Sequence, residues 1–93
     1  MSAISLAMFP LGLVVTTPGF LSRIPDPLAQ TIFLQRHRAG DWGDLDPEDA
    51  RSNDEAVKAG DRILSAYTHE GVKFWIITEA DRSVTTFLLP EEY

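Results

Sequence analysis

The sequence predicts an α+β fold in which a three- to four-stranded antiparallel sheet packs against two or three helices. Its C-terminal third is rich in β-branched and aromatic residues, its middle carries residues that start and stop helices, and a short apolar segment precedes both. Strands that follow helices and are joined by tight turns favour an antiparallel sheet. The 93 residues are expected to form a single compact domain, 1–93, because a chain of this size can bury a core.

The N-terminal segment is apolar, and its first charged side chain is Arg23. Met1–Ser5 supplies no Lys or Arg, which the basic start of a secretory signal requires, and the apolar run is too short to span a bilayer. We therefore expect a lead-in followed by a buried strand over Leu11–Thr16. This strand should supply the N-terminal member of the sheet.

Three helix starts are predicted, because a capping residue is followed directly by proline at each of them. Thr17 caps a short helix. Asp26 caps the clearest helix, which should end before Gly40, and Asp46 caps a third helix, which should end before Gly60.

The helical period indicates which side chains of the second helix face the core. Arg36 falls on the apolar stripe, so its guanidinium must reach solvent or a carboxylate such as Asp41 or Asp44. His37 is expected to lie more to the side. On the third helix Asn53 is expected to face the core and to hydrogen-bond to the backbone or to a loop. The other members of the apolar stripe are Leu28, Ala29, Ile32 and Phe33.

The C-terminal third is predicted to be a β-meander with strands "DRILSAYT", "VKFWIIT" and "SVTTFLL". The turns "HEG" and "EADR" connect them, and Asp81 and Arg82 are expected to form turn contacts and a local ion pair. Both faces of the middle strand are apolar. Helices should therefore cover one side, and something should partly cover the other.

The negative charge is concentrated in one stretch. The net charge is −6, and residues 41–55 hold seven of the 14 acidic residues against Arg51 alone, so this stretch carries the whole excess. Nucleic-acid binding through a basic face is therefore disfavoured, whereas a basic partner would be attracted. The alternative is a solvated acidic helix start, because carboxylates stabilise a helix N-terminus.

Catalytic and metal sites receive little support from the sequence. His37, Asp41, Asp44 and Asp46 offer one nitrogen and several oxygens, but they lack the EF-hand spacing and a second clustered histidine. The segment "AGDWG" lacks the lysine of a phosphate-binding loop. No histidine is placed by the pattern to act on Ser65, so no catalytic residue, metal or cofactor is predicted.

Trp42 has two interpretations. It lies between Gly40 and Gly43, where the chain can turn sharply. In the first interpretation the ring fills the gap between two helices. In the second it is an exposed aromatic anchor surrounded by acidic residues, of the kind found at protein interfaces.

Two blocks, "RHRAGDWGDLDPEDARSNDEAVKAGDRILSAYT" and "KFWIITEADRSVTTFLLPEEY", together with "VVTTPG", resemble a family of small bacterial proteins. Its members occur on plasmids, integrated elements and chromosomes, and are often labelled plasmid-related or type I restriction-modification subunit M. The resemblance covers nearly the whole chain but brings no activity to any residue. A chain of 93 residues has no room for a methyltransferase domain and its cofactor site, which argues against the restriction label.

The resemblance implies a mobile-element context, in which small acidic proteins disarm host defences. We therefore expect a cytoplasmic, non-enzymatic binding protein, concretely an anti-CRISPR-like inhibitor of a basic protein or ribonucleoprotein, without direct nucleic-acid or membrane binding. Lack of cysteine suits that compartment. The expected interface comprises Asp41, Trp42, Asp44, Asp46, Glu48 and Asp49.

Two alternatives remain open. The first is an enzyme or small-ligand binder, with a site formed by Arg36, His37, Asp41, Trp42, Tyr67 and Glu79. The second is a structural or regulatory module whose polar residues only cap helices and form turns. The second alternative predicts a buried Trp42 and an Arg36 paired to a nearby carboxylate.

Overall fold

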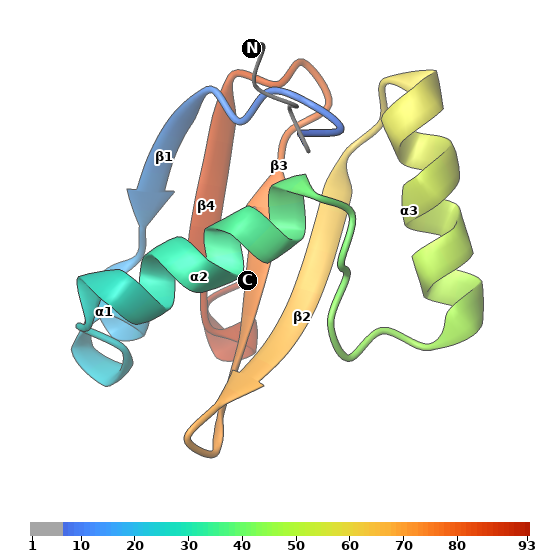
Figure 1. Cartoon of the computed structure of the whole chain (residues 1–93). Coiled ribbons are helices and arrows are strands. Elements are labelled where there is room, and N and C mark those ends of the chain that lie inside the picture. The colour runs from blue at the N-terminus through green and yellow to red at the C-terminus, as the bar shows by residue number, and fades with distance from the viewer. Residues whose placement is uncertain (1–6) are drawn as a thin grey trace, which may run out of the picture.

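The computed structural model describes residues 7–93 as a four-stranded sheet with three helices and a C-terminal 3-10 turn (Figure 1). Residues 1–6 of the expected lead-in lie outside the described residues. The elements in chain order are β1 (Leu13–Thr16), α1 (Pro18–Arg23), α2 (Pro27–Arg38), α3 (Pro47–Ala59), β2 (Ile63–His69), β3 (Val72–Thr78), β4 (Val84–Leu88) and η1 (Pro90–Glu92).

The sheet has the strand order β1-β4-β3-β2. The predicted meander is confirmed, because β2, β3 and β4 pair antiparallel. The sheet as a whole is mixed, however, because β1 pairs parallel to β4. Between β1 and β2 the chain passes through α1, α2 and α3 and so moves from one edge of the sheet to the other. The pairings make β2 run in the same direction as β1. The third strand of the meander then returns beside β1 in that direction.

The expectation that the N-terminal strand is buried is wrong. β1 is an edge strand of only four residues, and the side chains of Leu13 and Val14 are 68% and 39% exposed. β4 pairs with one side of β1, and no strand within residues 7–93 pairs with the other side. The apolar composition indicated a strand correctly, but not its place at the edge.

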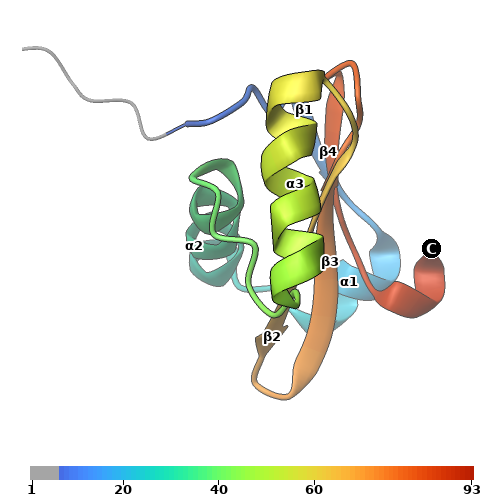
Figure 2. The same cartoon turned by 90° about the vertical axis from the view of Figure 1, so that its right-hand side faces the viewer.

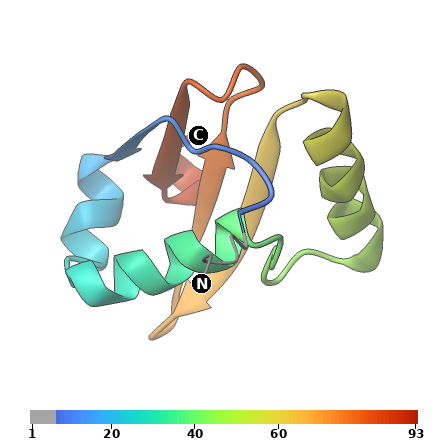
Figure 3. The same cartoon turned by 45° about the horizontal axis from the view of Figure 1, so that its top comes forward.

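α2 crosses one face of the sheet, whereas α3 lies beside β2 (Figures 1 and 3). The buried line of α2 runs through Ala29, Phe33 and His37, at four-residue spacing. The buried face of α2 is therefore turned by about one residue from the predicted stripe, so that Leu28 and Ile32, which were expected to face the core, are exposed. The main core gathers around this line and contains Phe20, Ile24, Ala29, Phe33, Tyr67, Phe74, Ile76, Phe87 and Leu89.

A second, smaller core attaches α3 to the sheet. Phe9, Trp42, Ala56 and Ile63 are buried together there. Figure 2 shows α3 standing alongside the sheet, with the connection from α2 running past its lower end. The far side of α3 is therefore left to solvent, consistent with the exposure of most of its residues.

Asn53 is buried and hydrogen-bonds to the backbone, as the sequence predicted, and the backbone that it binds is the outer edge of β2. Its Nδ2 donates to the carbonyl of Leu64 at 2.6 Å, and its Oδ1 accepts from the Leu64 N–H at 3.3 Å. The amide thus replaces a neighbouring strand at this residue. Glycine allows a second such closure, because Gly43 (φ 75°) passes so close to the Ala66 carbonyl that a Cβ would collide with it.

Replacing Asn53 by alanine is expected to destabilise the fold by about 1–3 kcal/mol, because both backbone groups of Leu64 lose their partner. Urea unfolding followed by far-UV circular dichroism measures the change. Ser52→Ala, at the exposed neighbouring position, is the control and should cost well under half as much. Equal costs for both variants would contradict the role of Asn53.

The turn before β4 differs from the expected local ion pair. The guanidinium of Arg82 donates to the carbonyls of Ala56 and Asp61 at 3.1 and 2.6 Å, so it binds the C-terminal end of α3. Asp81 instead accepts from the N–H of Ser83. Arg82 points away from its neighbour because its backbone is left-handed, with φ 61°.

The second face of the sheet is partly covered by the C-terminal residues. The ring of Tyr93 packs edge-on against Trp75, with ring centroids 5.6 Å apart. Glu92 ties the same segment to the start of α1, since its carboxylate accepts from the Thr17 hydroxyl and from the Gly19 N–H. This partial cover agrees with the expectation from the two apolar faces of the middle strand.

Candidate binding face

The acidic segment, residues 41–55, comprises the loop before α3 and most of that helix. This segment lies at the β2 edge of the sheet, where α3 stands in Figure 1. All seven acidic residues are exposed, and the loop and helix that carry them are fixed to β2 by the second core. They are Asp41, Asp44, Asp46, Glu48, Asp49, Asp54 and Glu55.

Of these seven carboxylates, Asp41 is the one that forms an ion pair within residues 7–93. Arg36 Nε lies 2.7 Å from Asp41 Oδ2, and Arg36 Nη2 lies 3.3 Å from Oδ1. This guanidinium lowers the pKa of Asp41, and the carboxylate raises the pKa of Arg36. The sequence prediction that Arg36 meets a nearby carboxylate is therefore confirmed.

Three further carboxylates hold the segment in place through hydrogen bonds. Asp46 caps α3 by accepting from the Asp49 N–H at 2.8 Å, and Asp44 accepts from the Thr68 hydroxyl at 2.9 Å. Asp54 accepts from the indole N–H of Trp42 at 3.0 Å. All of these donors are neutral, so the hydrogen bonds bring no positive charge to the carboxylates.

Trp42 is 6% exposed, so the exposed-anchor interpretation is wrong and the structural one is confirmed. Its ring stacks on Phe9 and meets the edge of His37, with centroids 6.1 Å apart in both cases. Left-handed backbone at Gly40 and Gly43 turns the chain inward on either side of the ring. Trp42 therefore leaves the predicted interface.

His37 is completely buried, in contrast to the expected position at the side of its helix. Its Nδ1 lies 2.5 Å from Ser65 Oγ, and its Nε2 lies 2.9 Å from Thr78 Oγ1. The sequence pattern placed no histidine near Ser65, because the two residues are 28 positions apart. Only the crossing of α2 over the sheet brings them together.

A buried chain of hydroxyls fixes the tautomer of His37. Thr85 Oγ1 donates to the carbonyl of Leu11 at 2.7 Å, so it must accept from Thr78 Oγ1, also 2.7 Å away. Thr78 has then used its single hydrogen and accepts from Nε2–H of His37. Nδ1 is left as the acceptor for Ser65. The sequence analysis did not predict this polar chain. The only signal in the sequence was the presence of Ser and Thr at strand positions that face the core.

Ser65 and His37 in this polar chain are the residue types of a nucleophile–base pair, but neither is accessible. Ser65, Thr78 and Thr85 are fully buried, as is His37, so a substrate cannot reach their oxygens without opening the core. Burial also lowers the pKa of His37 to about 3, which keeps the imidazole neutral and makes it a weak base. The arrangement satisfies buried polar groups, and no catalytic role is assigned to it.

The residues of the alternative ligand site are not united. Arg36 lies over the ring of Tyr67, 4.8 Å from its centroid, and the Tyr67 hydroxyl donates to the carbonyl of Asp41. His37, however, points into the core, and Glu79 pairs with Arg62 at 3.6 Å on the opposite face of the sheet. Burial raises the pKa of Tyr67 to about 12, so its hydroxyl is a hydrogen-bond donor rather than a base at neutral pH.

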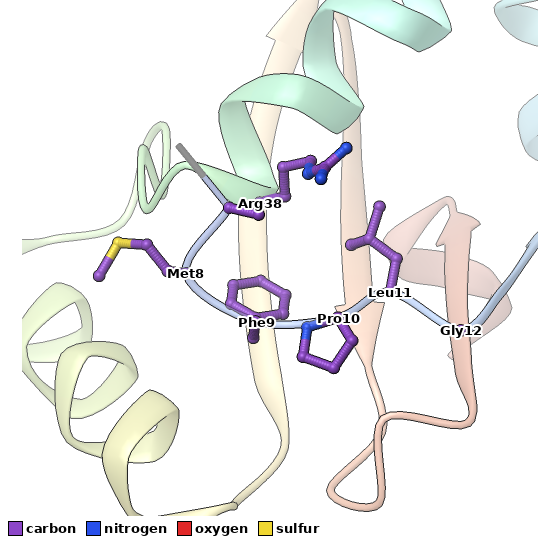
Figure 4. A pocket seen from close by; sticks show the side chains of 7 residues that line it. Met8, Phe9, Pro10, Leu11, Gly12 and Arg38 are labelled. Carbon is purple, nitrogen blue, oxygen red and sulfur yellow. The ribbon is translucent and has the colours of Figure 1, made fainter. Parts of the chain in front are cut away.

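A shallow groove of about 570 Å³ lies along the segment Ala7–Gly12 (Figure 4). Met8 and Phe9 project to different sides of this segment, and the guanidinium of Arg38 lies above it. Arg38 is the one charged side chain among its lining residues. The groove therefore brings no acid–base pair to a substrate.

Within residues 7–93, no three His, Asp or Glu side chains are grouped to hold a metal ion, and no helix has the length and apolar character for a membrane span. The fold and its surface define a small α+β domain with an acidic face on α3. No protein-family model matches the chain, and no match was found among curated proteins or solved structures.

Proposed function

We propose that the protein is a small acidic binding protein that acts without catalysis, through the carboxylates of residues 41–55, on a basic protein or ribonucleoprotein. The observation that carries this proposal is the absence of ion pairs within residues 7–93 for all of these carboxylates except Asp41. An internally neutralised segment would attract no cationic target. An uncompensated one raises the association rate with such a target.

The rigid attachment of the segment supports the proposal. Gly43 bridges to Ala66, Asp46 caps α3, and Asn53 binds the edge of β2. The carboxylates are therefore held in one arrangement before binding, which lowers the entropy cost of association. Trp42 contributes to this rigidity rather than to the contact itself.

The most concrete form of the proposal is an inhibitor of a host defence complex in the cytoplasm. Its support is the resemblance to proteins carried on mobile elements, together with the acidic face, which can compete for lysine- and arginine-lined nucleic-acid channels. A ribonucleoprotein effector has such a channel.

Reversing two unpaired carboxylates on α3, in the double variant E48K/E55K, is expected to weaken association with the basic partner by at least about tenfold and to reduce its salt dependence. The partner is first recovered from host lysate at low salt, and its affinity is then measured by calorimetry at low and high salt. These side chains are exposed and form no hydrogen bond or ion pair with residues 7–93, so the fold should be kept. Glu48 is in the first turn of α3, so its reversal should cost about 1 kcal/mol or less of stability.

The matched control is E70K/E91K, which changes the net charge equally but on turns outside the acidic segment. It should keep most of the affinity, because short-range complementarity at the interface is preserved. Equal affinities for both variants, or a partner whose binding does not depend on salt, would overturn the proposal.

A further inference from the structure

The two edges of the sheet differ in how their backbone groups are satisfied. On β2, the outward N–H and C=O of Leu64 bind Asn53, and those of Ala66 bind the carbonyl of Trp42 and the N–H of Asp44. This edge is therefore closed to another strand over most of its length. Natural sheets commonly protect their edges in this way.

The β1 edge is open. Leu13 and Thr17 donate their N–H groups to the carbonyls of Ser83 and Phe87 on the β4 side. Because backbone groups alternate along a strand, the N–H and C=O of Val14 and Thr16 point away from the sheet. Residues 7–93 provide no hydrogen-bond partner for them.

A groove of about 470 Å³ runs along this open edge, between β1 and α2. Its walls offer apolar and neutral polar side chains and no charged one, so it suits an uncharged extended segment. It is lined by Val14, Val15, Thr16, Gln30, Thr31, Leu34 and Phe87.

The elements that carry most of the exposed apolar residues lie on the same side of the molecule. Figure 1 shows β1, α1 and the start of α2 together, opposite α3. These three elements carry five of the seven large apolar residues that are exposed within residues 7–93, which are Leu13, Val14, Leu21, Leu28 and Ile32. Such a cluster beside an unpaired strand edge is typical of an interface.

The charge of this side permits contact between two copies of an acidic chain. Near β1 and α1 the chain carries Arg23 together with the carboxylates of Asp26 and Glu92, so this side holds few charges of either sign. The acidic segment lies beyond β2, at the other edge of the sheet. Two chains that meet at β1 therefore keep their acidic segments apart, so the net charge of −6 on each chain opposes association only weakly.

We propose that the β1 edge binds β1 of a second copy, antiparallel and around a two-fold axis at Val15. In this register Val14 pairs with Thr16 of the second copy, Thr16 pairs with Val14 of the second copy, and the four outward N–H groups all find acceptors. Val15 faces its own equivalent. The result is a continuous eight-stranded sheet with an acidic segment at each end.

Several features favour a second copy over a strand from another protein. β1 itself, "LVVT", is the uncharged, β-branched segment that the neutral groove suits. The edge is also self-complementary, because its two free residues are spaced symmetrically about Val15. α2, which carries the exposed residues Leu28 and Ile32, lies on the same face of the joined sheet in both copies.

The oligomeric state tests this interface on the whole chain, without any partner. Light scattering coupled to gel filtration should give about twice the monomer mass of 10.3 kDa at high protein concentration. Val14→Lys places a charge in the groove and should raise the dimer dissociation constant at least about tenfold. Thr68→Lys, on the edge strand β2 that is already closed, is the matched control and should leave the mass unchanged.

Cross-linking tests the register. The chain contains no cysteine, so Val15→Cys introduces a single thiol that should meet its equivalent at the two-fold axis. Directly opposed residues of a non-hydrogen-bonded antiparallel pair lie about 4.5 Å apart at Cα, within the range that a disulfide needs. V15C should therefore form disulfide dimers under mild oxidation, and V14K/V15C and T68C should form far fewer.

Two results would overturn the proposal even if the acidic segment binds its partner as proposed. One is a wild-type chain that remains monomeric at the highest concentration reached, which would leave the β1 edge to a strand of another protein. The other is a dimer that V14K does not weaken and that V15C does not cross-link, which would place the contact elsewhere.

Discussion

Replacing Trp42 by alanine is expected to lower the free energy of unfolding by about 3–5 kcal/mol, the usual cost of removing a buried tryptophan. The ring forms the centre of the second core, where it contacts Phe9 and His37. Its loss also leaves Asp54 without the indole donor. Urea unfolding followed by far-UV circular dichroism measures the change.

The second tryptophan of the chain is the matched control. Trp75 is half-buried on the opposite face of the sheet, so Trp75→Ala should cost clearly less, because less of its area is removed from water. A W42A variant that keeps its stability but loses partner binding would contradict the structural role. It would restore the interpretation of Trp42 as an anchor.

The stability of the fold is expected to decrease as the pH falls below 6.5, because His37 is buried in its neutral form. The unfolded chain binds a proton on this imidazole near pH 6.5, whereas the folded chain resists it until a pKa of about 3. Between these values the unfolded state holds one more proton. The free energy of unfolding therefore rises with pH by roughly 1 kcal/mol per pH unit and reaches its full value above pH 6.5.

Urea unfolding at a series of pH values between about 5 and 7 measures this slope before carboxylates begin to titrate. Asp41 and Glu92 have pKa values lowered by their hydrogen bonds, so their contributions are lost only in more acidic solution. The chain has two histidines, which provides the control: His37→Gln should remove most of the slope, and His69→Gln should keep it. Equal slopes for the two variants would contradict a buried neutral His37.

Helix caps were the most reliable sequence signals. Thr17, Asp26 and Asp46 each cap the helix predicted for them, and each accepts from a backbone N–H in the first turn. These interactions are local, since a cap and its donor are two or three residues apart. The strand over Val72–Thr78 was also predicted with its observed bounds.

The face that α2 buries could not be read from its own sequence. Two overlapping lines, one through Leu28 and Ile32 and the other through Ala29 and Phe33, are both apolar, and the next residue of the first line is Arg36 while that of the second is His37. The strands decide between them. Hydroxyls on β2 and β3 bind the imidazole, so the buried line is the one that ends in a residue able to use them.

The candidate binding face shows the same division. The charge of residues 41–55 is a property of composition, and the sequence determined it alone. The sequence left open whether Arg36 reaches solvent or a carboxylate, and the structure pairs it with Asp41. Whether Trp42 belongs to that face depended on how far the chain turns inward at Gly43 beside Ala66 of β2. The sequence places Ala66 more than 20 positions away.

The sequence by itself determined the helices, the meander and the concentration of charge, because caps, alternation and composition act over a few neighbouring residues. Only the tertiary structure decided the parallel pairing of β1 with β4, the burial of His37 and Trp42, and the open β1 edge. Each of these depends on which segments meet after the chain crosses the sheet. Such contacts join residues far apart in the sequence, and no local pattern encodes them.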